Sequence, residues 1–283
     1  MGELRDKFGR HMRLRGLAEK TRILYDHAIV DLVRAYRIAP DQLTNDQIQD
    51  HLERIIRERG VSWSTTNVYF AAYRCFYQDF LKRPLKEFWL PSRGRSRKRP
   101  RILDRETVRR ILEAPRLLKH RALLTMVYGS GLRVGEVCRL RPHHIESAPD
   151  RMLVRVEQGK RHKDRTTILA VRGLELLREC WQTYGPTVWL FFGHDRTKPL
   201  PIPTAQCIYH GACRRAGVHE AHGIHSLRHA FATHLLEQGA NLAVIQRCLG
   251  HSSVSTTAQY CHVSAAALRH VRSPADTLGE PTE

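Results

Sequence analysis

The N-terminal part of the chain has apolar side chains at helical spacing, interrupted by residues that begin or end helices. Between residues 17 and 38 the apolar positions recur every three or four residues, which predicts an amphipathic helix that stops before Pro40. Thr44 is placed to cap a second helix that Gly60 closes, and a third helix is expected over residues 62–80. The pattern predicts a small all-helical domain, and its aromatic side chains are interpreted mainly as core.

After residue 101 the apolar pattern changes between helical and strand-like periods. Asp104 is predicted to cap a helix, and further helices are expected over residues 120–128, 134–140, 173–184, 204–216, 225–238, 241–249 and 254–261. Residues 151–157 alternate in polarity and residues 166–171 form a second β-rich run, so a hairpin with a long basic tip is expected. Residues 188–192 are interpreted as a buried strand or core turn. The predicted fold class is mainly α with a small β-sheet, a helical domain followed by a mixed α/β domain.

One segment breaks the apolar pattern completely. Residues 93–101 hold six basic side chains and neither an acidic nor an apolar one, so the segment cannot bury itself and is interpreted as a linker. The predicted domains are therefore residues 1–91, a linker at 92–101, a second domain at 102–263 and a tail at 264–283. A solvated spacer is the simpler interpretation, but we favour DNA contact, in which phosphates are neutralised by Arg93, Arg95, Arg97, Lys98, Arg99 and Arg101.

The charge of the whole chain favours a polyanionic partner. The formal net charge is +19 and the isoelectric point is about 10.2, which makes nucleic acid the leading partner and an anionic membrane surface the second. No run approaches the roughly 18 apolar residues of a membrane helix, and no signal peptide is evident, so a cytoplasmic protein is expected. The seven cysteines lack the spacing of a disulfide framework or a zinc knuckle.

The candidate chemistry lies in the second domain. His225, Arg228 and His229 fall on one face of a predicted helix, whose other face is apolar. Such a pattern is usually a solvated charged face. A zinc site at His225, His229 and His234 is disfavoured because no glutamate lies between the first two histidines. His225 and Arg228 on this helix, combined with four more residues, instead suggest a phosphate clamp with a phenol nucleophile. The full set is Arg133, Lys160, His225, Arg228, His251 and Tyr260.

In this order and at these intervals, the six residues resemble the tyrosine recombinase family, also called phage integrase or Xer-like. The resemblance covers the whole chain and is strongest over residues 222–263, which hold Ser226-Leu227-Arg228-His229, Leu249-Gly250-His251 and Ser255-Thr256-Thr257 followed by Tyr260. In the N-terminal half, Thr21-x3-Tyr25 and Ser64-Thr65-x-Asn67 resemble the helical core-binding domain of the family. The resemblance implies a recombinase that cleaves and rejoins DNA.

Elementary chemistry gives each residue type its role. A phenol with a pKa near 10 needs about 3 units of activation, roughly 4 kcal/mol, to attack a phosphate at neutral pH, and Tyr260 is the expected nucleophile. Charge on the non-bridging oxygens favours the forked donors of Arg133 and Arg228. Lys160 is the expected general acid for the leaving 5′-oxygen, with Lys163 as a substitute. The resemblance makes His225 a base or phosphate donor and His251 a further donor. Glu136 is interpreted as orienting Arg133.

The resemblance also implies how the reaction proceeds. A 3′-phosphotyrosyl intermediate keeps the bond energy, so neither metal nor ATP is expected, and no motif for either occurs in the sequence. Four protomers would act on two DNA duplexes, with the tail docking on a neighbouring subunit. The tail resembles those of integron integrases, whereas a mobile-element or Xer-type role fits equally well. Rival hypotheses are a type IB topoisomerase-like relaxing enzyme, a regulator without catalysis and a zinc hydrolase.

Overall fold

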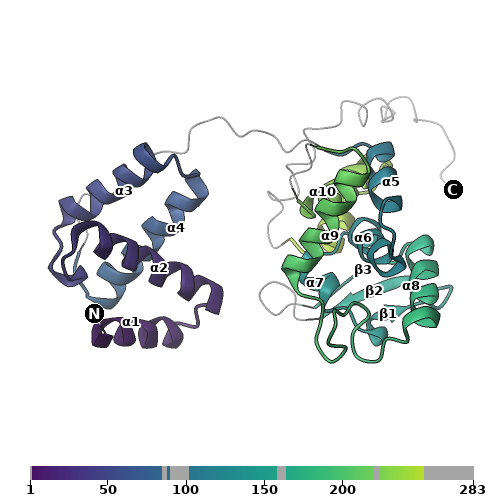
Figure 1. The fold of residues 1–283 in the computed structure, drawn as a ribbon, viewed down its shortest axis with the longest axis horizontal. Coiled ribbons are helices and arrows are strands. Elements are labelled where there is room, and N and C mark those ends of the chain that lie inside the picture. The colour runs from purple at the N-terminus through teal and green to yellow at the C-terminus, as the bar shows by residue number, and fades with distance from the viewer. Residues whose placement is uncertain (1, 85–87, 90–101, 158–163, 220–222, 252–283) are drawn as a thin grey trace, which may run out of the picture. The chain divides into compact units, whose positions relative to one another are not determined.

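A computed structural model of the chain describes residues 2–84, 88–89, 102–157, 164–219 and 223–251 (Figure 1). The chain divides into two compact units, residues 1–98 and 99–283. The described part is mostly helical with one small antiparallel sheet, so the predicted fold class is confirmed. Among the described residues, no helix combines the length and apolar character that crossing a bilayer requires.

The first unit consists of helices around one apolar core. Its elements are α1 (Gly2–Leu14), α2 (Glu19–Tyr36), the 3₁₀ turn η1 (Pro40–Gln42), α3 (Asn45–Arg59), α4 (Trp63–Tyr73) and the π-helix η2 (Arg74–Phe80). Thr44 forms a capping box with Gln47 at the start of α3, and Gly60 ends that helix in the left-handed conformation, both as expected. The buried positions of Tyr73, Phe76 and Tyr77 confirm the core interpretation of these aromatics.

Two features of this unit differ from the expectation. Helix α1 was not predicted, because its sequence is largely charged and only Phe8 and Met12 are buried, one turn apart. The helix expected over residues 62–80 is regular only as far as Tyr73 and continues as the π-helix η2. Trp63 at its start is 37% exposed and lies outside the core.

The second unit places a three-stranded sheet among helices. Its helices are α5 (Arg105–Glu113), α6 (Leu118–Ser130), α7 (Val134–Cys138), α8 (Val171–Tyr184), α9 (Ile202–Arg215), α10 (His225–Glu237) and α11 (Leu242–Leu249). The 3₁₀ turn η3 (Pro142–His144) leads into the antiparallel strands β1 (Ile145–Glu146), β2 (Leu153–Val156) and β3 (Arg165–Ile168). Helix α6 packs against α8 and α10 (Figure 1). Helix α11 packs against β3.

The sheet differs from the prediction in two ways: its last strand is shorter, and it has one additional strand. The β2–β3 hairpin is present, with Val154 opposite Thr167, but β3 stops at Ile168 and α8 already begins at Val171. The two-residue strand β1 was not predicted, since two residues carry no periodicity. Residues 188–192 form no regular strand beyond an isolated bridge between Phe192 and Pro199, and Leu190, Phe191 and Phe192 are buried, which agrees with the alternative of a core turn for these three residues.

Candidate active site

A glycine turn between α6 and α7 positions Arg133. Gly131 ends α6 with φ +61°, and a Cβ atom at this position would lie 2.4 Å from the ring of Phe231 on α10. Glycine is therefore required both by the left-handed backbone and by the close approach of α10. Arg133 follows as the N-cap residue of α7, at the mouth of a pocket.

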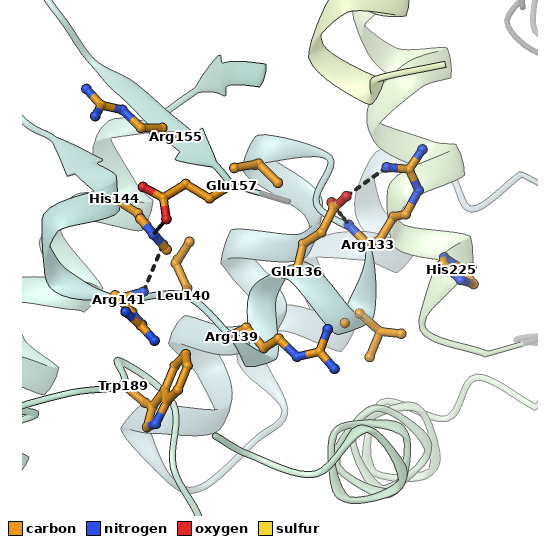
Figure 2. Close-up of a pocket in the computed structure, with 13 residues that line it drawn as sticks. Arg133, Glu136, Arg139, Leu140, Arg141, His144, Arg155, Glu157, Trp189 and His225 are labelled. Atoms are coloured by element: carbon orange, nitrogen blue, oxygen red, sulfur yellow. Dashed lines mark hydrogen bonds and ion pairs between the residues drawn. The ribbon is translucent and has the colours of Figure 1, made fainter. Parts of the chain in front are cut away.

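Glu136 holds Arg133 from one turn further along α7. Its carboxylate accepts hydrogen bonds from Nη1 and from the backbone N–H of Arg133, each at 2.7 Å (Figure 2). The contact expected between Glu136 and Arg133 is present, and the orienting role remains a prediction. Burial alone would raise the pKa of Glu136, but hydrogen bonds and charge from Arg165 and Arg133 outweigh burial and lower that pKa to about 2. The carboxylate is thus ionised at every pH at which the protein would act.

Arg228 is buried on α10 rather than on a solvated face. The residue is 5% exposed, and its guanidinium donates to the carbonyl oxygens of Gly131 and Leu249, the latter at 2.6 Å. A solvated charged face is therefore excluded for this arginine. A buried guanidinium needs hydrogen-bond acceptors for its N–H groups, and these carbonyls supply two of them.

The C-terminal end of α11 is the meeting point of the site. Three successive carbonyl oxygens at this end accept hydrogen bonds from three different arginines: Cys248 from Arg165 at 2.9 Å, Leu249 from Arg228 at 2.6 Å, and Gly250 from Arg133 at 3.1 Å. The last carbonyls of a helix have no partner inside it and lie at the negative end of its dipole. A helix end of this kind gathers cations, and here it brings Arg133 and Arg228 together.

Gly250 turns the chain so that His251 faces Arg228, as predicted. Its φ is +62°, and Nη2 of Arg228 lies 3.3 Å from Nε2 of His251. Since arginine can only donate, Nε2 of His251 accepts and its proton lies on Nδ1. Burial together with the charges of Arg228 and Arg133 lowers the pKa of His251 to about 4, so the ring is neutral at pH 7.

His225 completes the group of described residues. It is the first residue of α10 and lines the same pocket as Arg133 (Figure 2). Burial, followed by the charges of Arg228 and Arg133, lowers its pKa, which leaves a neutral imidazole able to accept a proton. The pocket has a volume of about 550 Å³ and is also lined by Arg139, Arg141 and Arg155, so arginines outnumber the carboxylates of Glu136 and Glu157 in its lining.

Four of the six predicted site residues are thus brought together: Arg133, His225, Arg228 and His251. The other two, Lys160 and Tyr260, lie outside the described residues, as do Lys163 and all six basic residues of the linker. Arg165 was missed by the sequence reasoning. It lies five residues after Lys160 at the start of β3, and its contacts with Glu136 and Cys248 span 29 and 83 residues. The sequence reasoning placed Arg165 in the basic tip of the hairpin, just before the β-rich run at 166–171, and no motif marked it as a buried residue.

The histidine trio considered for zinc does not form a metal site. His234 is buried, and its Nδ1 is hydrogen-bonded to the hydroxyl of Tyr128 at 2.9 Å. Among the described residues, the potential ligand atoms that cluster belong to His143, His144 and Glu157. Nδ1 of His144 accepts from the backbone N–H of Arg141, so the ring proton is on Nε2, which faces Glu157 at 3.4 Å. A protonated ring nitrogen is not a metal ligand.

Comparison with known proteins decides the family. Residues 101–267 match the phage integrase family, and residues 4–87 match the N-terminal SAM-like domain of phage integrases. The chain belongs to the phage integrase family. The resemblance to tyrosine recombinases seen in the sequence motifs therefore reflects membership of this family. Nothing in the comparisons favours a topoisomerase.

Individual relatives give the same result. The chain is 34% identical to y4qK of Sinorhizobium fredii, which its name describes as an integrase/recombinase, over 99% of this chain and 91% of the relative. It is 31% identical to the tyrosine recombinase XerA of Thermococcus kodakarensis over 79% of each chain. Among solved structures, XerH bound to its difH substrate in a post-cleavage complex matches 96% of this chain and 83% of that chain, with TM-score 0.74 and 20% identity. A lambda integrase dimer bound to a core site matches 90% of this chain and 96% of that chain, with TM-score 0.71 and 20% identity.

Proposed function

We propose that this chain is a site-specific DNA recombinase that cleaves and rejoins strands through a 3′-phosphotyrosyl intermediate on Tyr260. One observation carries the proposal: Arg133 and Arg228, from distant parts of the chain, meet at the end of α11 beside two neutral histidines. Two forked cations next to groups that can accept a proton suit a phosphodiester whose charge increases during attack.

The described residues support a division of labour around the phosphate. Arg133 and Arg228 bind the non-bridging oxygens, and removal of one such donor costs on the order of 10²–10³ in rate. His225 is neutral because of its lowered pKa, so it can take the proton of the attacking phenol. His251 contacts Arg228 and fixes the phosphate site. Lys160 protonates the leaving 5′-oxygen, with Lys163 as its substitute.

The reaction in this proposal needs neither metal nor ATP. The phosphotyrosyl ester keeps the energy of the phosphodiester bond that was broken, and the 5′-hydroxyl of a partner strand attacks it in the second step. Arginines supply the positive charge that a metal ion would otherwise provide. Strand transfer should therefore proceed in EDTA without nucleotide.

The finer features of the assembly belong to the same proposal. The substrate is double-stranded DNA, held by a helical DNA-binding domain at residues 1–91 and a catalytic domain at 102–263, with the basic linker at 92–101 on the backbone. Four protomers act on two sites, and residues 264–283 dock on a neighbouring subunit. One relative by fold is titled a lambda integrase tetramer bound to a Holliday junction, which supports this arrangement. The protein acts in the bacterial cytoplasm, where such DNA lies.

Strand exchange between two labelled duplexes tests the function. The probe is a set of duplexes covering the DNA that flanks the protein's own gene, incubated in EDTA without ATP. Recombination predicts joined products that carry both labels. A relaxing enzyme would instead remove supercoils from a single plasmid and give no joint products, and that outcome would contradict the proposal.

A further inference from the structure

Arg165 makes three hydrogen bonds within the site, although no role has been assigned to it above. It begins β3, and its side chain is 8% exposed. Its two terminal nitrogens form a fork on the carboxylate of Glu136 at 2.8 and 2.7 Å, and its Nε donates to the carbonyl of Cys248 at 2.9 Å. Three of its five N–H donors are thus engaged within the protein, and the side chain links two other parts of the site.

Arg165 contacts a carboxylate and a helix end that also hold the two arginines of the phosphate clamp. Glu136 is the carboxylate that also holds Arg133. Cys248 precedes Leu249 and Gly250, whose carbonyls hold Arg228 and Arg133. Arg165 therefore connects α7 to the end of α11, beside the groups that hold both clamp arginines.

The backbone is shaped to admit this side chain. A Cβ atom on Gly250 would lie 2.6 Å from Cδ and 2.9 Å from Nε of Arg165. Real Cβ atoms do not approach other atoms so closely, so the absent side chain at Gly250 makes room for the stem of the arginine. Glycine at this position serves both the turn toward His251 and the packing of Arg165.

Electrostatics explains why the connection needs an arginine. Glu136 lies between Arg133 and Arg165, so a single buried carboxylate balances two guanidinium groups. A planar guanidinium can hold both carboxylate oxygens with its terminal nitrogens and still donate from Nε to a carbonyl, whereas a lysine ammonium provides a point charge without that geometry.

We propose that Arg165 is a positioning residue of the recombinase: it fixes Glu136 and the end of α11 relative to each other, and so sets the spacing of Arg133 and Arg228. The proposal rests on the function proposed above. Arg165 is also the first residue of β3 and lies five residues after Lys160, the expected general acid. Its contacts therefore fix the chain just after the segment that contains Lys160.

The test separates DNA binding from chemistry. The substitutions are Arg165→Met, Arg165→Lys, Glu136→Gln and the double substitution Arg165→Met/Glu136→Gln. The control is Arg109→Lys, because Arg109 also holds a carboxylate with two nitrogens: its Nε and Nη2 donate to Glu106 at 2.9 and 2.6 Å, on the exposed surface of α5. Two quantities are measured on duplexes from the DNA that flanks the gene: the dissociation constant at fixed salt, and the single-turnover rate constant for covalent protein–DNA adducts.

A positioning role predicts a loss of rate without a loss of binding. Arg165→Met should lower the adduct rate constant by about 10²-fold, with Arg165→Lys between it and the unaltered protein, while the dissociation constant changes by less than about threefold. The double substitution should be no slower than the slower single one, because both residues act through one support. Arg109→Lys should leave both quantities unchanged.

Three results would overturn the proposal: an adduct rate constant for Arg165→Met within about threefold of the unaltered protein, equal losses in binding and rate, or additive losses in the double substitution. If Arg165→Met lacks a cooperative thermal transition, Arg165→Lys decides by the same criteria. Absence of adducts from the unaltered protein would instead contradict the proposed function.

Discussion

At the scale of single residues, two glycines with the same backbone conformation should respond very differently to alanine. Gly250 and Gly217 have φ of +62° and +66°, but only Gly250 has a side chain against its Cβ position. Gly217→Ala should cost about 1 kcal/mol of unfolding free energy, the usual penalty for a left-handed residue. Gly250→Ala should cost more and also slow adduct formation, because Arg165 must move. Urea denaturation and adduct assays check both, and equal effects at the two positions would contradict the packing argument.

The lowered pKa of His251 predicts how the stability of the protein changes in acid, which is a second test at this scale. Its pKa is about 4 in the folded protein, below the ordinary value of 6.5. Between those two pH values the unfolded chain binds a proton that the folded chain does not, so stability falls as pH decreases from 6.5 to 4. His225, His229 and His234 also have lowered pKa values and act in the same direction. His251→Asn should therefore lose less unfolding free energy over this window than the unaltered protein. An identical loss, measured by urea denaturation at several pH values, would contradict the assignment.

At the scale of elements, the short helix α11 acts as the anchor of the clamp. Asn241 caps it, accepting from the backbone N–H of Ala243 at 2.8 Å. Asn241→Ala should cost about 1 kcal/mol, and because the end of α11 holds three arginines, adduct formation should slow while DNA affinity is kept. Asp104→Ala removes the cap of α5 at similar cost and is the control, expected to leave the adduct rate unchanged. If both substitutions slow adduct formation equally, the adduct rate follows overall stability and not the position of α11, which would contradict the anchoring role.

Helix ends that are set by nearby residues could be predicted from the sequence, whereas elements that depend on contacts with distant parts of the chain could not. Thr44, Asp104 and Gly250 act on backbone within a few residues, so each of these helix ends was predicted from sequence. Helix α1 and strand β1 exist because other elements cover them, and neither has a strong period of its own. The convergence of Arg133 with Gly250 joins positions 117 residues apart, and only the motif pattern indicated it. No sequence motif indicated the contacts of Arg165.

At the scale of the whole molecule, the charge of +19 predicts strongly salt-dependent DNA binding. Each phosphate contact contributes roughly 0.9 to the slope of log affinity against log salt concentration. Replacing the six basic residues of the linker by glutamine should lower the magnitude of that slope by up to about 5. Titrations at several salt concentrations measure it. Six glutamine replacements among arginines and lysines of α1 and α2 serve as the comparison, and an unchanged slope for the linker variant would show that the linker does not touch DNA.

The central claim is that one phosphodiester, held by Arg133 and Arg228, is attacked by Tyr260. The most direct measurement is the covalent adduct formed on duplexes from the DNA that flanks the gene, with Tyr260→Phe beside Tyr184→Phe, a control tyrosine at the end of α8. We predict adducts from the unaltered protein and from Tyr184→Phe, none from Tyr260→Phe, and a DNA-linked peptide containing residue 260. Adducts that persist in Tyr260→Phe would contradict the account.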